Sequence, residues 1–334
     1  MIVALALLGY AALLLTAGAA ALARARWTDR TPRLAVAAWL ALSGSAVTSV
    51  ILGGAALVVP SVRVSAGLSA LLAACMMALR AGYAHPGGAA VAGAGGMLGL
   101  AVSARVTWCV AVTLARAALA RRRHQRVLAL AGRRDRRSGA MLLDHDEAAA
   151  WCLPGAGHQI VLTTAAVRAL DEAQLASVLA HERAHQRGHH HLLVSLTGSL
   201  AAAFPWVPAF RQAHEEVARL VELLADDAAA AVSQRRKVAE ALLALAAPAP
   251  AAALGAGGSA TAARVRRLIA APAPIGRART VGGVFSVAAL AAFPLILLAS
   301  PAIAVIGRHY CPPAVTAPAV PGHCPAAGCE PAER

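Results

Sequence analysis

The sequence predicts a mainly α-helical protein in which several membrane-spanning helices carry an embedded, more polar domain. Three observations lead to this fold class. Hydrophobic residues make up 59% of the 334 residues, charged residues only 14%, and the mean hydropathy is +0.62, which is far from the balance of a soluble domain. Four apolar stretches are long enough to cross hydrocarbon. A more polar region, about residues 121–280, separates the last of them from the others.

The four predicted spans cover residues 1–22, 34–59, about 88–118 and 281–306. The first stretch could also be a secretory signal, because small residues between Ala19 and Ala23 imitate a cleavage site. No positive charge precedes it, however, and Arg24, Arg26, Arg30 and Arg33 follow it. We therefore predict an uncleaved anchor with its N-terminus outside the cell.

The distribution of arginine predicts the topology of the remaining spans. Arginines follow both the first and the third span, and such clusters mark cytoplasmic segments. The second cluster contains Arg121, Arg122, Arg123, Arg126, Arg133 and Arg134. An even number of crossings must separate the two clusters, so we read the apolar residues 64–83 as a helix on the outer face, with an additional span as the alternative.

This topology divides the chain into four parts. Residues 1–120 form a membrane domain, 121–280 a cytoplasmic domain, 281–306 the last span and 307–334 a short tail outside the cell. Residues 192–210 are also apolar, but Pro205 and Pro208 interrupt them. They favour a hairpin that dips toward the bilayer or packs on the polar domain.

Residues 181–185 read His-Glu-Arg-Ala-His, the HExxH pattern typical of zinc-dependent hydrolases. On a helix, positions i and i+4 share one face, so His181 and His185 can bind one metal ion while Glu182 holds the attacking water as general base. Asp171 and Gln174 resemble the capping box that begins such a helix. The alternative is a chance occurrence in a chain with 12 histidines.

A catalytic zinc ion usually has three protein ligands, and two residues compete to be the third. His191 completes the longer HExxHxxGxxH pattern of the metzincins, but these need a methionine after the motif, and none of the five methionines follows it. Glu222 fits better. Arg219, Glu222 and Asp226 share one helical face, so Asp226, with Arg219 nearby, can orient a ligand histidine.

HERAH, followed by RLVELLADD at residues 219–227, resembles the BlaR/MecR-type membrane metallopeptidases, which are antirepressor gluzincins, and more distantly the HtpX-type proteases. Residues 154–163 resemble the strand that precedes the zinc helix in both groups, beside which an extended substrate would lie. The resemblance covers roughly residues 120–275. It implies an α+β gluzincin metalloprotease domain with one Zn²⁺ per chain. The residues it implies are His181, His185 and Glu222 as ligands, Glu182 as base and Asp226 in support.

The expected function is that of a membrane zinc endopeptidase with a cytoplasmic active site. The resemblance implies a winged-helix transcriptional repressor as substrate, and an HtpX-like quality-control protease is the alternative. Only a short tail follows the last predicted span, so we do not expect the β-lactam sensing of the best-known members. His214 and Arg219 are candidate oxyanion donors. The alternative of another class is a non-catalytic membrane transducer or metal-handling protein, with residues 181–191 as a metal sink.

The net charge of +15 and the pI of about 11.2 do not predict nucleic-acid binding. The arginines cluster at the ends of apolar spans, and aromatic residues are only 4% of the chain, so anionic lipid headgroups are the expected partner. Of six cysteines, four are expected outside the cell as candidates for two disulfides: Cys75, Cys311, Cys324 and Cys329. With His309 and His323, the tail could alternatively bind a metal.

Overall fold

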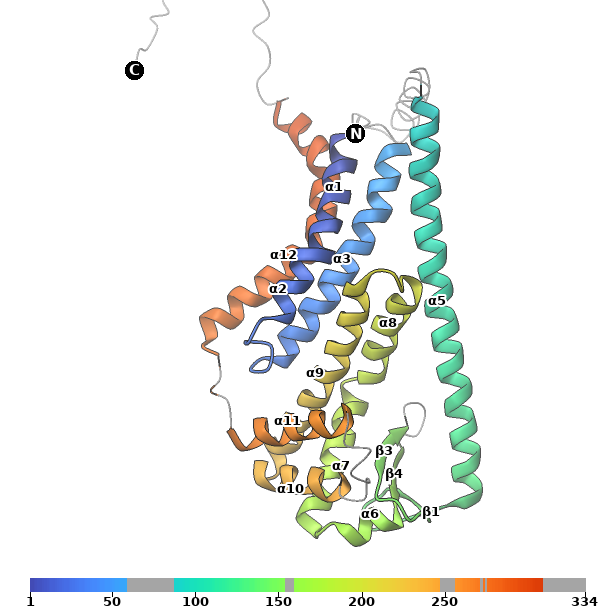
Figure 1. The fold of residues 1–334 in the computed structure, drawn as a ribbon, viewed down its shortest axis with the longest axis vertical. Helices are drawn as coiled ribbons and strands as arrows, with labels where there is room; N and C mark the ends of the chain where they lie inside the picture. Colours follow the sequence, from blue (N-terminus) through green and yellow to red (C-terminus); the bar gives the residue numbers. More distant parts are fainter. Residues whose placement is uncertain (59–86, 154–158, 247–255, 271–272, 274, 309–334) are drawn as a thin grey trace, which may run out of the picture.

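The computed structural model describes residues 1–58, 87–153, 159–246, 256–270, 273 and 275–308. It is mainly helical, with one small sheet. Helices α1, α3 and α12 gather at one end of the molecule, the sheet with α6, α7, α10 and α11 lies at the other, and α5 runs along the length between them (Figure 1). The predicted outer helix at 64–83 and the four cysteines assigned to disulfides lie outside the described residues.

All four predicted spans are helical. Helix α1 (Ile2–Leu13) continues through a π-helical turn (Leu14–Gly18) into α2 (Ala19–Ala23), and the others are α3 (Pro32–Val58), α5 (Gly88–Ala131) and α12 (Arg277–Arg308). In the described part of the chain, these four segments are long and apolar enough to cross a membrane. Helix α5 has 44 residues, about 66 Å. It therefore extends well beyond a hydrocarbon layer of about 30 Å and reaches the sheet.

The apolar residues 192–210 supply most of the first helix, the turn and the start of the second helix of a helical hairpin. Helix α8 (His190–Ala203) and helix α9 (Pro208–Val232) pack against each other, and Pro208 occupies the first turn of α9. The hairpin also packs on α3 and α5. The predicted hairpin is confirmed, because the chain turns between Phe204 and Val207 instead of continuing as one helix.

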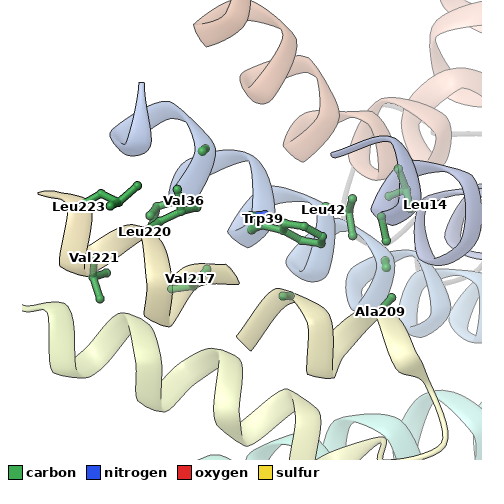
Figure 2. Close-up of a cluster of buried hydrophobic side chains, with 13 residues drawn as sticks. Leu14, Val36, Trp39, Leu42, Ala209, Val217, Leu220, Val221 and Leu223 are labelled. Atoms are coloured by element: carbon green, nitrogen blue, oxygen red, sulfur yellow. The ribbon is translucent and has the colours of Figure 1, made fainter. Parts of the chain in front are cut away.

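The largest buried cluster joins α9 to α3. Figure 2 shows Val36, Trp39 and Leu42 of α3 facing α9, which contributes Val217 and Leu220. Trp39, Val217 and Leu220 are fully buried. This packing fixes the rotation of α9 about its axis. Residues on its opposite face are thereby directed toward the sheet end of the molecule.

The sheet has four short strands in the order β1-β2-β4-β3. They are β1 (Gly132–Arg134), β2 (Met141–Leu143), β3 (Ala150–Leu153) and β4 (Gln159–Thr163). Strand β4 pairs in parallel with β2 and antiparallel with β3. The expectation that an extended substrate lies beside residues 154–163 is therefore wrong for β4, since both of its edges are occupied. Among the described residues, the unpaired edge that faces the helices is that of β3.

Four helices complete the sheet end: α6 (Thr164–Ala169), α7 (Glu172–Arg187), α10 (Arg235–Ala246) and α11 (Ala256–Ala270). Helix α7 begins with the predicted capping box, which is confirmed. The Asp171 carboxylate accepts from the backbone N–H of Gln174 at 2.7 Å, and the Gln174 side chain accepts from the backbone N–H of Asp171 at 3.0 Å. These bonds satisfy amides that have no partner within the helix.

A tight turn separates α7 from α8. His189 has a φ of 47°, a left-handed conformation that is uncommon for a residue with a side chain. The turn brings the imidazole of His190 over Gly188, where an added Cβ would collide with that ring. Glycine at position 188 is therefore required for the placement of His190.

We expect Leu220→Ala to destabilise the protein by about 2–5 kcal/mol, because it leaves a cavity in the α3–α9 core. The thermal unfolding midpoint of the full chain in detergent measures this effect. Val232→Ala is the control, because Val232 lies on the same helix with 73% of its surface exposed. Equal midpoints for the two variants would contradict the role assigned to this core.

Candidate metal centre

The structure brings three potential metal ligands together. His181 and His185 lie one turn apart on α7, and Glu222 reaches them from α9. One ligand atom from each residue lies within 4.8 Å of the others. The two imidazoles are mostly buried, with 13% and 15% of their side chains exposed.

The spacing of these atoms fits a tetrahedral metal ion. The Nε2 atoms of His181 and His185 are 3.1 Å apart, and each lies 3.5 Å from a carboxylate oxygen of Glu222. Ligands held about 2.0–2.1 Å from a tetrahedral zinc ion are separated by about 3.3 Å. Two nitrogens and one carboxylate oxygen are also a donor set that zinc accepts.

Each histidine has a partner on its other ring nitrogen. The Nδ1 atom of His181 lies 3.1 Å from the Asp226 carboxylate, and the Nδ1 atom of His185 lies 2.9 Å from Nδ1 of His190. Such partners fix the ring orientation and keep Nε2 free for a metal ion. Sequence reasoning expected the role of Asp226 but did not identify His190.

Arg264 of α11 enters the same site. Its guanidinium donates two hydrogen bonds to Asp226, at 2.8 and 2.7 Å, and its Nη1 lies 3.0 Å from Glu222. Next to it, Arg267 makes a paired contact with Asp227. The sequence contains a signal for these contacts, because adjacent aspartates on one helix match two arginines three residues apart on another.

Burial and charge set the protonation of the group. Burial opposes the charged form of His181, but Asp226 and Glu222 outweigh it and raise the pKa to about 9. Burial also favours neutral carboxyl groups, yet His181 and Arg264 hold the pKa values of Glu222 and Asp226 below their usual range. Burial lowers the pKa of His185. Both carboxylates are therefore charged at neutral pH and His185 is neutral, whereas His181 carries a proton that a bound metal ion would displace.

A cleft of about 420 Å³ opens beside the three candidate ligands. Strand β3 lines one side with Trp151 and Cys152, and α10 lines another with Val238 and Leu242. Glu182 is buried at its base, and this burial raises the pKa of its carboxyl group. The cleft therefore offers apolar walls, one strand edge and a carboxylate of raised proton affinity beside the candidate metal ligands.

Cys152 lies against Glu182 within this cleft. Burial, together with the nearby carboxylate, raises the pKa of the thiol to about 12. The thiol is therefore neutral at physiological pH, and among the described residues it is not part of the candidate ligand group. The sequence analysis did not identify Cys152 as part of the site.

Three residues proposed from the sequence lie elsewhere. Arg219 pairs with Asp29, at 2.7 Å, and with Glu216, so Arg264 occupies the position beside Asp226 expected for Arg219. His214 lies against Gly198 and Thr197 between α8 and α9 and does not line the cleft. His191 follows His190 by one position, which turns it away from His185, and it is not part of the ligand group. These three residues are displaced for the same reason. Each lies on a helix that also carries a residue of the site, but its side chain faces a different neighbour.

Comparison with known protein families agrees with this geometry. Residues 115–270 match the model of peptidase family M48. The match supports a metallopeptidase and includes every residue of the His181, His185 and Glu222 group. Searches of curated proteins and of solved structures each gave no match.

We expect His190→Ala to weaken zinc binding by about 10- to 100-fold, as the loss of a partner of a ligand histidine typically does. His191→Ala should have little effect, which makes it a matched control one position away. Glu222→Ala should lower zinc affinity further, because only two ligands remain. Zinc titration of the purified full-length variants measures all three. Full zinc binding in Glu222→Ala with loss in His191→Ala would contradict this ligand set.

Proposed function

We propose that this protein is an integral membrane zinc endopeptidase whose active site faces the cytoplasm. One observation carries the proposal. Two HExxH imidazoles and the Glu222 carboxylate converge at tetrahedral spacing beside Glu182, within a segment that matches the M48 peptidases. This coincidence of motif, spacing and family favours peptide hydrolysis over a metal sink, which would have no need of Glu182 in the same cleft.

The residues of the chain supply most of the chemistry. His181, His185 and Glu222 would hold a zinc ion, which would polarise the scissile carbonyl and make water a better nucleophile. Glu182 takes the proton from the attacking water and passes it to the leaving amine, and its raised pKa suits both steps. Asp226 and His190 hold the two histidines in orientation. Arg264 keeps Glu222 and Asp226 charged and in place.

The substrate chain is proposed to lie along β3. The edge of this strand borders the cleft, and an extended peptide can pair with such an edge through its backbone. Val238, Leu242 and Leu245 of α10 form the facing apolar wall. This arrangement favours an apolar substrate residue next to the cleaved bond.

A cytoplasmic transcriptional repressor of the winged-helix type is the proposed substrate, on the resemblance to the antirepressor peptidases. An HtpX-like role in membrane quality control is the second candidate, because the same site could accept unfolded segments. The two differ in substrate range. Comparison of protein N-termini in cells with the active and the Glu182→Gln chain distinguishes one cleaved repressor from many cleaved membrane proteins.

The membrane setting rests on the four apolar helices and on the arginines that follow the first and third of them. In this proposal both termini lie outside, and the peptidase domain lies on the cytoplasmic side against the bilayer. Anionic lipid headgroups are the proposed partners of the exposed arginines.

Glu182→Gln should bind zinc as the wild type does and lose proteolysis by at least about 100-fold, because only the general base is removed. Zinc content and cleavage of a fluorescent casein by the purified full chain measure the two properties. The amide has nearly the same size as the carboxylate, so the thermal midpoint should be unchanged. Wild-type cleavage by this variant would refute the catalytic assignment.

Cysteine labelling tests the topology. Arg236→Cys places a thiol at an exposed site on α10, with 85% of the Arg236 side chain exposed, and Ile2→Cys does so near the N-terminus, at 85% exposure. With an impermeant reagent, Ile2→Cys should react in intact cells, and Arg236→Cys only after permeabilisation. The unsubstituted chain corrects for native cysteines. Reaction of Arg236→Cys in intact cells would reverse the proposed orientation.

A further inference from the structure

A second cavity lies among the apolar helices, away from the metal centre. Its volume is about 700 Å³, within the range of small-ligand sites. Helix α3 forms the floor with Leu34, Ala38 and Leu42, and the two walls come from α1–α2 and α12. Helix α12 runs beside α1 and α3 in its upper part and turns away from α2 below (Figure 1).

Two contacts hold α12 at the upper end of this cavity. The backbone carbonyl of Leu290 accepts hydrogen bonds from Tyr10, at 3.1 Å, and from Ser45, at 2.8 Å. Farther down, Gly283 approaches Leu34 so closely that a Cβ would collide with it. The cavity therefore has a closed upper end and a closed floor. The stretch of α12 from Arg279 to Leu290, twelve residues, gives the cavity a length of about 16 Å.

The lower end of the cavity is basic. Arg26 and Arg30 line it from the segment between α2 and α3, and Arg279 lines it from α12. All three side chains are exposed, and within the described part of the chain none of them pairs with a carboxylate. Trp27 also lines the cavity, and tryptophan is favoured at a membrane interface.

The wall of the cavity also departs from regular helix. Leu14 and Gly18, the first and last residues of the π-helical turn, both line it. Single π-helical turns within α-helices occur frequently at functional sites. The described chain thus combines an irregular helix, an elongated apolar cavity and a cluster of unpaired arginines in one place.

We propose that this cavity binds one anionic phospholipid, with its phosphate at Arg26, Arg30 and Arg279 and one acyl chain along Leu34, Leu42 and Leu290. The inference rests on the membrane setting proposed above. A free anion would use only the basic end and leave the long apolar part empty. A lipid without a phosphate would fill the apolar part and leave three arginines without a partner, and a zwitterionic headgroup would bring its own positive charge toward them. Only an anionic amphiphile matches both ends.

The lipid site is connected to the metal centre through the segment that carries Arg26 and Arg30. Asp29 of this segment accepts from Arg219 of α9 at 2.7 Å, and its backbone carbonyl accepts from Arg267 of α11 at 2.9 Å. Helix α9 carries Glu222, and α11 carries Arg264. The proposed lipid thus contacts the same short segment that holds the two helices of the metal centre.

Native mass spectrometry of the full chain in nonionic detergent tests the proposal. With added phosphatidylglycerol, the wild type should retain one lipid per chain and should retain phosphatidylcholine much more weakly. Replacement of Arg26, Arg30 and Arg279 by Gln should weaken retention by about 100-fold, on the usual strength of an arginine near an anionic headgroup. The matched control replaces Arg24, Arg33 and Arg277, which belong to the same segments but do not line the cavity.

A second pair of variants tests the apolar part. Ala21→Trp places a large ring at an exposed position on the wall and should reduce retention, whereas Ala23→Trp, exposed on the same helix but outside the cavity, should not. Thermal midpoints verify that the variants are folded. Equal retention by the two arginine triples, or by the two tryptophan variants, would overturn the proposal. Inorganic phosphate is also tested as a competitor for bound phosphatidylglycerol. If the phosphate concentration that displaces it is 10-fold lower than the phosphatidylcholine concentration that does so, the site binds a free anion and the proposal is overturned.

Lipid retention is measured without any substrate cleavage. The lipid site and the peptidase activity can therefore be refuted independently of each other. A wild-type chain that retains phosphatidylglycerol but cleaves no substrate supports the lipid site and counts against the peptidase. Cleavage by a chain that retains no lipid refutes the lipid site and leaves the peptidase standing.

Discussion

The buried carboxylate of Asp226 is the contact on which the metal centre depends. It is fully buried on α9, and it binds His181 of α7 and Arg264 of α11 at the same time. A buried carboxylate without partners would cost several kcal/mol, so both partners are needed for α9 to pack as it does. Because Asp226 occupies Nδ1 of His181, the Nε2 atom of that ring is left facing Glu222 and His185. One interaction thereby joins three helices and selects the histidine tautomer.

Helix α9 both packs against α3 and supplies carboxylates to the candidate metal centre, and it uses opposite faces for these two roles. One face carries Val217 and Leu220, which are fully buried in the cluster that contains Trp39 of α3. The opposite face carries Glu222 and Asp226. Any rotation of α9 that moved the carboxylates would also break the apolar packing, which has no slack because protein cores are closely packed. The rigidity of the metal centre therefore derives from the helices that we propose to be embedded in the membrane.

The sequence predicted those features that depend on local periodicity. The four apolar helices, the capping box at Asp171, the hairpin at 192–210 and the shared face of Glu222 and Asp226 all follow from residue spacing within one element. The sequence did not predict features that depend on contacts between residues far apart in the chain. Arg264 reaches Asp226 from a helix 38 residues later, and the sheet order hides β4 behind β3. His190 replaces His191 beside His185 because of a left-handed residue, His189, that spacing alone does not reveal.

The core shared by α3 and α9 bears on how such a peptidase could be inherited. The segment that matches the M48 model begins at residue 115 and therefore excludes α3, although α3 covers the apolar face of its ligand-bearing helix. Cut out by itself, the matched segment would expose Val217, Leu220 and Leu223 to water. In this chain the matched segment therefore depends on α3 and does not form an independent domain. It would have to be transferred between genes together with its anchor, or acquire a substitute surface to cover α9.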